Sequence, residues 1–177
     1  QPEPLDEALN ALYYLDDLFT QTVPEVLNDF AKELKRINVE VPVTARPLSF
    51  GNWIGGDRDG NPNITAEITT KAMVLQVGHA IRVTIAAMND LRQMLSVSTN
   101  IVGSTPELTA SIEKDFKNIP EFEPRFLRLN AEEPYRLKAT AIVHRLAFTR
   151  DRHAVGAPHV ANRDYKNTAE LLSDLVL

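Results

Sequence analysis

The densest group of residues capable of chemistry lies between positions 51 and 63. It combines glycines, carboxylates, one arginine and amides: Gly51, Asn52, Gly55, Gly56, Asp57, Arg58, Asp59, Gly60, Asn61 and Asn63. Glycine lets a backbone turn with positive φ and lets a ligand come close to amide groups. A guanidinium between two carboxylates can be oriented toward a carboxylate or phosphate of a ligand. The other interpretation is a turn whose aspartates bond their own backbone, and the residues alone leave both open.

The same loop also has part of a calcium-binding pattern. Asp57, Asp59 and Asn61 have the spacing of the first three ligands of an EF-hand loop. The sixth position, which needs glycine, holds Pro62, and the twelfth, which needs glutamate, holds Ile68. We therefore predict no metal ligands in the chain and keep calcium binding only as an alternative.

Elsewhere the sequence lacks the common catalytic motifs. Cysteine is absent, which excludes disulfides and thiolate sites. The four histidines form neither an HExxH motif nor a pair four residues apart, and no nucleophile elbow or phosphate-binding glycine loop is present. Arg136 stands near an expected helix start, where an exposed arginine is the simplest interpretation.

Composition limits the classes of partner. The chain has 177 residues, of which 44% are hydrophobic and 24% charged, as in ordinary globular proteins. Its net charge of −5 disfavours binding to nucleic acid or to anionic membranes. The sequence has no apolar run long enough for a transmembrane helix, so we predict neither nucleic-acid nor membrane partners.

The elements that must position the loop are mostly helical. Apolar spacing of three and four predicts one helix through Phe19, another from Pro24 to Asn38, and a long helix from Thr65, its cap, to Leu95. Further helices are expected after Ser104 or Thr105, over 130–152, and from Thr168 onward. Residues 39–43 alternate and 47–54 are strand-like, so the predicted fold class is mostly α with one or two short strands.

Two strings resemble a known family. Residues 50–65, FGNWIGGDRDGNPNIT, resemble the FGxWxGGDRDGNPxVT segment of phosphoenolpyruvate carboxylases. Residues 133–136, EPYR, resemble a second element of that family. The resemblance implies that residues 1–177 are a single internal segment from the N-terminal half of a larger α/β-barrel enzyme. It implies a cytoplasmic, allosteric homotetramer that supplies oxaloacetate to the citric-acid cycle.

The resemblance also implies a reaction. These enzymes fix carbon dioxide by joining bicarbonate to phosphoenolpyruvate, with Mg²⁺ or Mn²⁺, to give oxaloacetate and phosphate. The family's TAHPT-type histidine motif, its glycine- and arginine-rich loop and its acidic metal ligands match nothing here. We therefore expect no catalytic residue, no bound metal and no carboxylation by this chain alone.

What the chain carries, by this resemblance, is a loop at the substrate site. Trp53 is expected to form a hydrophobic wall, and Arg58 to be an orienting cation braced by Asp57 and Asp59. The remaining loop candidates are Gly55, Gly56 and Asn61. The other interpretation is that Asp57 and Arg58 only hold the loop to its neighbours. Arg136 resembles an arginine that plant members use to bind an activating sugar phosphate, whereas bacterial members are regulated differently.

A function from another class remains as the alternative. The chain would then be a stand-alone helical interaction domain whose Asp/Asn loop is structural or binds Ca²⁺.

If the chain is instead a segment of a larger enzyme, it should expose apolar surface and self-associate.

Overall fold

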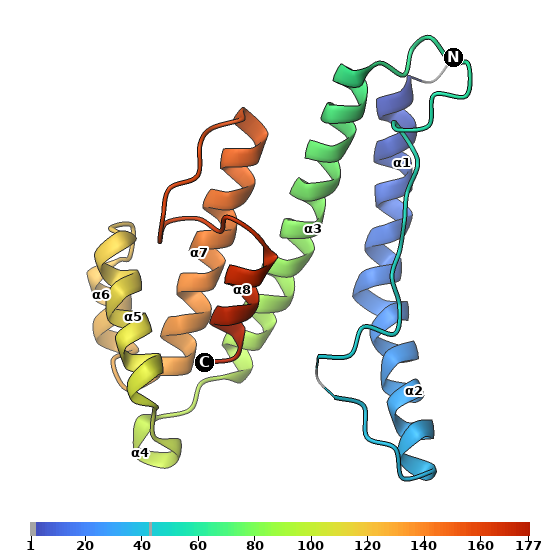
Figure 1. Ribbon diagram of the computed structural model, residues 1–177. Helices are drawn as coiled ribbons and strands as arrows, with labels where there is room; N and C mark the ends of the chain where they lie inside the picture. The colour runs from blue at the N-terminus through green and yellow to red at the C-terminus, as the bar shows by residue number, and fades with distance from the viewer. Residues whose placement is uncertain (1–2, 43) are drawn as a thin grey trace. The chain divides into compact units, whose positions relative to one another are not determined.

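The computed structural model describes residues 3–42 and 44–177 as an almost entirely helical chain (Figure 1). The helices are α1 (Pro4–Asp17), a π-helical turn η1 (Leu18–Thr22), α2 (Val23–Arg36), α3 (Ala66–Met94), α4 (Thr99–Val102), α5 (Pro106–Asn118), α6 (Pro124–Leu129), α7 (Pro134–Val155) and α8 (Thr168–Leu175). The chain forms two compact units, one ending at His79 and the other beginning at Ala80. Helix α3 therefore contributes residues to both. None of the described helices is long and apolar enough to span a membrane.

The predicted short strands are wrong. Neither 39–42 nor 47–54 forms a strand, and no other described residue does; Val43 lies outside the described residues. A strand needs a partner for its backbone groups, and the hydrogen bonds near 47–54 are local instead. The Ile54 amide donates to the Asn52 side chain at 2.8 Å, and the Gly56 amide to the Trp53 carbonyl at 2.8 Å. The described residues therefore contain no strand of the expected barrel.

The first unit has little buried apolar surface on its N-terminal helices. Ala8 and Leu12 of α1 are buried, whereas α2 buries no residue. Phe19 and Phe50 meet edge to face with ring centroids 5.1 Å apart, which ties the π-helical turn to the segment before the loop. His79 of α3 pairs with the Asp16 carboxylate of α1.

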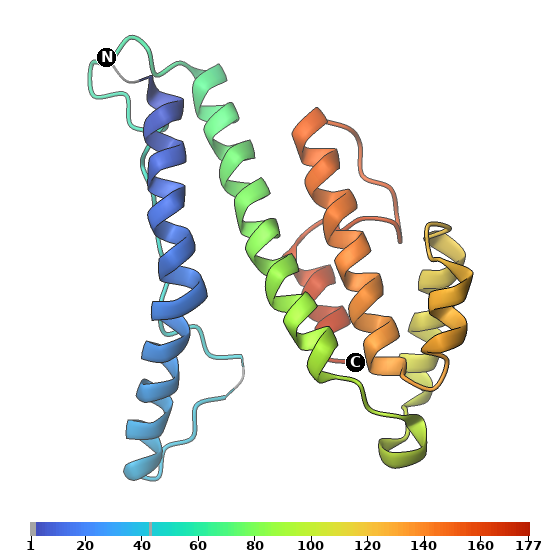
Figure 2. The same ribbon diagram turned by 180° about the vertical axis from the view of Figure 1, so that it is seen from behind.

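The second unit is built around α7, which lies between α3 and the α5–α6 pair in both views (Figures 1 and 2). Ile142 and Leu146 pack in one cluster with residues of α3 and with Tyr165. Leu137 packs against α5 in a second cluster, and Ala141 belongs to a third. Because α7 is covered on several sides, it lacks the one-sided apolar pattern of a surface helix.

Local signals set the helix ends. The Thr65 hydroxyl accepts from the Ile68 amide at 3.3 Å just before α3, and the Thr105 hydroxyl accepts from the Leu108 amide at 3.1 Å before α5. The expected Thr65 cap is confirmed, and of the two caps predicted for the next helix, Ser104 or Thr105, the structure shows Thr105. Helix α7 ends at Gly156, whose φ of 65° is the left-handed conformation that stops a helix.

Candidate functional site

The predicted loop lies on the surface of the first unit and is held by its own backbone. The Trp53 carbonyl accepts from the amides of Gly56 and Asp57 at 2.8 and 3.0 Å. A second turn follows, in which the Asn61 amide donates to the Arg58 carbonyl at 2.5 Å. The Asn61 side chain in turn accepts from the Asn63 amide at 2.9 Å. In the alternative interpretation the aspartates would bond to their own backbone, but the side-chain bonds that shape this loop are made by the asparagines Asn52 and Asn61.

Gly55 anchors the loop to α3. It is buried, its φ is 77°, and a Cβ added to it would lie only 2.6 Å from the Cβ of Ala72. Gly60 also has a positive φ, of 75°, but a Cβ there would meet nothing within 4 Å. Only position 55 therefore needs glycine both for its backbone conformation and for a close approach.

The charged side chains of the loop point into solvent. Asp57, Arg58 and Asp59 are all exposed, as is Asn61. The expected bracing of Arg58 is not seen: among the described residues, no ion pair joins its guanidinium to either aspartate. Trp53 is 79% exposed, which is unusual for so large an apolar side chain. With respect to the described residues, the loop thus presents a guanidinium without an ion pair and an exposed indole.

The described residues do not fit a divalent metal. No group of three or more His, Asp or Glu side chains lies close enough to hold an ion in this part of the chain. The Asn61 side-chain oxygen already accepts a backbone hydrogen bond. No chemical step can therefore be assigned to a metal held by these residues.

Arg136 lies in the first turn of α7, in the second unit. Its guanidinium pairs with Glu133 at 2.9 Å and donates to the Asn130 side chain at 3.2 Å. Glu133 also accepts from the Ser96 hydroxyl at 2.8 Å. The Arg136 side chain is 27% exposed, so it is a held, half-buried arginine rather than the freely exposed one that the sequence suggested. With five N–H donors, it keeps some for a ligand.

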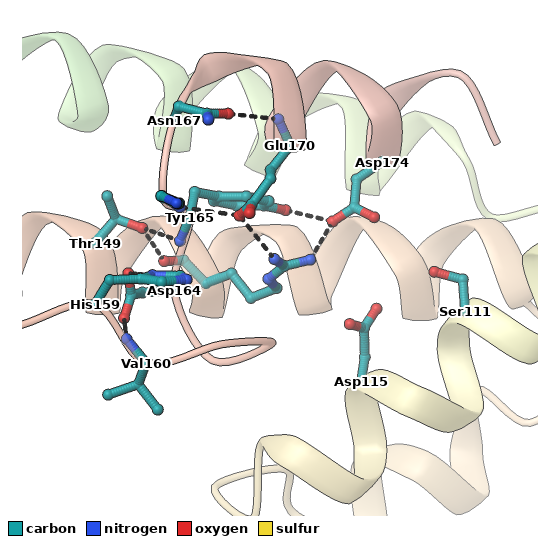
Figure 3. A network of polar contacts seen from close by, with 12 residues as sticks. Ser111, Asp115, Thr149, His159, Val160, Asp164, Tyr165, Asn167, Glu170 and Asp174 are labelled. Carbon is teal, nitrogen blue, oxygen red and sulfur yellow. Dashed lines mark hydrogen bonds and ion pairs between the residues drawn. The ribbon is translucent and has the colours of Figure 1, made fainter.

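The most extensive polar network was missed by sequence reasoning, and Figure 3 shows the part of it around Asp174, Tyr165 and Asp164. The Lys138 ammonium of α7 donates to Ser111 and Asp115 of α5, at 2.7 and 2.8 Å, and to Asp174 of α8 at 2.8 Å. Asp174 also accepts from Arg145 at 2.6 Å and from the Tyr165 hydroxyl at 2.7 Å. The one available signal was that Lys138 and Arg145, seven residues apart, share a face of an otherwise buried helix.

A second branch of the network holds the loop between α7 and α8. The Asp164 carboxylate accepts from His159 Nδ1 at 2.7 Å and from the Val160 amide at 2.8 Å, and it pairs with Arg152 Nε at 2.8 Å. Burial alone would raise the pKa of Asp164, but these donors outweigh it and hold that pKa below its ordinary value. The ionised carboxylate is thus the form that this loop stabilises.

At two other acids, Asp115 and Tyr165, the net change in pKa is upward. Burial raises the pKa of Asp115, although the hydrogen bond and charge of Lys138 oppose the change. Burial also raises the pKa of Tyr165 far above its ordinary value, with help from the negative charge of Asp174. The Arg145 guanidinium, 4.0 Å over the Tyr165 ring, opposes that increase. The structure therefore favours a neutral phenol at position 165.

Comparison with known proteins gives one family for the whole chain. A sequence profile described as phosphoenolpyruvate carboxylase matches residues 1–177. Proteins named phosphoenolpyruvate carboxylase from Gloeobacter violaceus and Trichormus variabilis are 30% and 32% identical over 100% of this chain, which covers 20% and 18% of their lengths. One from Rhodopseudomonas palustris is 35% identical over 97% of this chain, matching 18% of that protein. The chain thus spans about a fifth of the length of these relatives.

Proposed function

The chain belongs to the phosphoenolpyruvate carboxylase family, and we propose that it is part of an enzyme that carboxylates phosphoenolpyruvate with bicarbonate to give oxaloacetate and phosphate. The observation that supports this most strongly is the segment 50–65, FGNWIGGDRDGNPNIT, which contains the loop 51–63 and carries the resemblance. The remaining four-fifths of the enzyme would supply the catalytic histidines and the ligands of Mg²⁺ or Mn²⁺. The 177-residue chain alone would not catalyse the reaction.

In this proposal the loop binds and shields the substrate. Carboxylation passes through an enolate, which water would protonate to pyruvate, so the site must exclude water. The 79% exposed indole of Trp53 offers an apolar wall for that purpose. Arg58, which has no ion pair with the described residues, offers charge-assisted hydrogen bonds to a carboxylate or phosphate oxygen. Gly55, fixed against Ala72, keeps the loop in a defined position on α3.

Arg136 has a different proposed role, at an effector site. Its remaining guanidinium donors suit a phosphate group, as the resemblance to the plant arginine implies. A phosphorylated sugar would compete with Glu133 and Asn130 for the guanidinium. The proposal extends to a cytoplasmic homotetramer, the assembly and location that the resemblance implies.

The test is to express the full reading frame that encodes this sequence. We expect oxaloacetate formation that requires both bicarbonate and Mg²⁺. In that protein, Trp53→Ala should divert product from oxaloacetate to pyruvate, because water reaches the enolate. Arg58→Gln should raise KM for phosphoenolpyruvate, whereas Glu40→Gln, at an exposed position outside the loop, should change neither value. A folded full-length product without bicarbonate-dependent activity would overturn the proposal.

A further inference from the structure

A polar pocket of about 220 Å³ lies beside the network of Figure 3, within the second unit. Its wall is formed by Lys114 of α5, by Arg145 of α7, by residues of the loop 156–167 and by α8. At roughly 30 Å³ per water molecule, such a pocket holds about seven waters, or one small organic or inorganic acid. The loop 51–63 and Arg136 do not line it.

The carboxylates of the pocket wall are already neutralised. Asp174 accepts from Lys138, Arg145 and the Tyr165 hydroxyl, as described above. Glu170 accepts from the Lys166 amide at 2.9 Å and lies 3.9 Å from the Arg145 guanidinium. Behind the wall, Asp164 holds hydrogen bonds with His159 and the Val160 amide and an ion pair with Arg152. These acids therefore offer a cation little beyond what they already bind.

The uncommitted groups of the pocket wall are mostly donors. Within the described part of the chain, the exposed Lys114 ammonium has no ion pair. His159 binds Asp164 through Nδ1, which fixes its ring and leaves Nε2 for another partner. The side chains of Asn162 and Ser173 also line the pocket without a hydrogen-bond partner among the described residues. Arg145 Nε is buried and likewise lacks an acceptor there. The Lys114 ammonium, the Asn162 amide and the Ser173 hydroxyl are therefore left to donate to the oxygens of a ligand.

We propose that this pocket binds a small oxyanion, a carboxylate or a phosphate. The Lys114 ammonium would balance its charge, and the Asn162 amide and the Ser173 hydroxyl would donate to its oxygens. Charge-assisted hydrogen bonds of this kind are the stronger ones in proteins. The ligand joins α5, α8 and the loop between α7 and α8, so its binding stabilises their packing. This site is independent of the proposed carboxylation, and its test needs no catalysis.

The test is an NMR titration of the 177-residue chain with inorganic phosphate and, separately, with succinate, each against chloride at equal ionic strength. We expect saturable shifts at the His159 ring and at the Asn162 and Ser173 amides. Lys114→Gln should weaken binding about tenfold, the usual effect of losing one charge-assisted hydrogen bond. Lys117→Gln, an exposed lysine on the same helix but outside the pocket, is the matched control and should not.

A second variant separates binding from folding. The φ of Asn162 is 63°, a conformation that glycine accepts without strain, so Asn162→Gly should keep the fold and weaken binding. Tighter binding of phosphate than of succinate assigns a phosphate site, and the reverse order a carboxylate site. Absence of saturable shifts with both ions would overturn the proposal. So would equal affinities of Lys114→Gln and Lys117→Gln.

Discussion

At the scale of single residues, the two loop glycines with positive φ have different requirements. Gly55→Ala forces a methyl group against Ala72 and strains the backbone, and we expect it to cost about 2–4 kcal/mol of unfolding free energy. Gly60→Ala has the same backbone strain but open space, and should cost about 1 kcal/mol. Urea unfolding of the two variants beside the unmodified chain measures the difference. Equal losses would show that the contact with α3 does not hold the loop.

The buried phenol of Tyr165 should make the fold sensitive to alkali. Its folded pKa is raised while its unfolded pKa stays near the ordinary 10.0, so only the unfolded chain releases the proton above that pH. The contribution of this phenol to stability is therefore fully present below pH 10. Above pH 10 the free energy of unfolding falls by about 1.4 kcal/mol per pH unit. Tyr165→Phe loses one hydrogen bond to Asp174 at neutral pH but removes this slope. If the free energy of unfolding of both proteins falls equally with pH above 10, Tyr165 is not the cause of the alkaline destabilisation.

At the scale of helices, the Lys138 ammonium connects α7 to both α5 and α8. Its side chain is only 5% exposed, and it pairs with the carboxylates of Asp115 and Asp174, which are 4% and 11% exposed. Lys138→Met leaves Asp115 without that cation, and breaking a buried pair in this way costs about 3–5 kcal/mol. Lys138→Met combined with Asp115→Leu should recover much of the loss, because no unpaired charge remains. Lys32→Met, which breaks an exposed pair on α2, is the control and should change stability by less than about 0.5 kcal/mol.

Thermal or urea unfolding of these variants decides between two roles for the network. If the double variant is as unstable as Lys138→Met, the lysine acts through its packing rather than through charge. If the double variant recovers stability, apolar packing can hold the helices together without the ion pair. The role of the network is then to determine which helices pair. The latter is the result we expect, since isosteric apolar replacements of buried ion pairs are often tolerated.

The elements that could be predicted from the sequence are those determined by residues close to them along the chain. The long helix expected from Thr65 to Leu95 is α3, Ala66–Met94, because its cap and its apolar spacing are both local signals. The strand expected over 47–54 failed because a strand depends on a distant partner that the described residues do not supply. Lys138 was missed for the same reason, since its partners Asp115 and Asp174 are 23 and 36 residues away. The loop composition was recognisable, but the exposure of Arg58 was not.

At the scale of the whole molecule, the chain spans about a fifth of the length of its family relatives, and its first unit leaves an apolar helix face exposed. Helix α2 is strongly amphipathic in its sequence, yet none of its residues is buried. Val26, Phe30 and Ile37 share one face of this helix and its C-terminal cap and are 50%, 44% and 67% exposed. In a longer protein, a face of this kind is usually covered by other parts of the chain.

This exposed face predicts that the 177-residue chain associates with itself. Sedimentation velocity over a range of concentrations should show reversible growth in size, driven by burial of apolar area worth about 25 cal/mol per Å². Phe30→Lys should suppress it, because burying an unpaired ammonium is unfavourable. Asn28→Lys adds the same charge on the opposite face of α2 and should leave it unchanged. A monomer at every concentration, with sharp two-state unfolding, would mean that α2 needs no cover and that its amphipathic pattern has another cause.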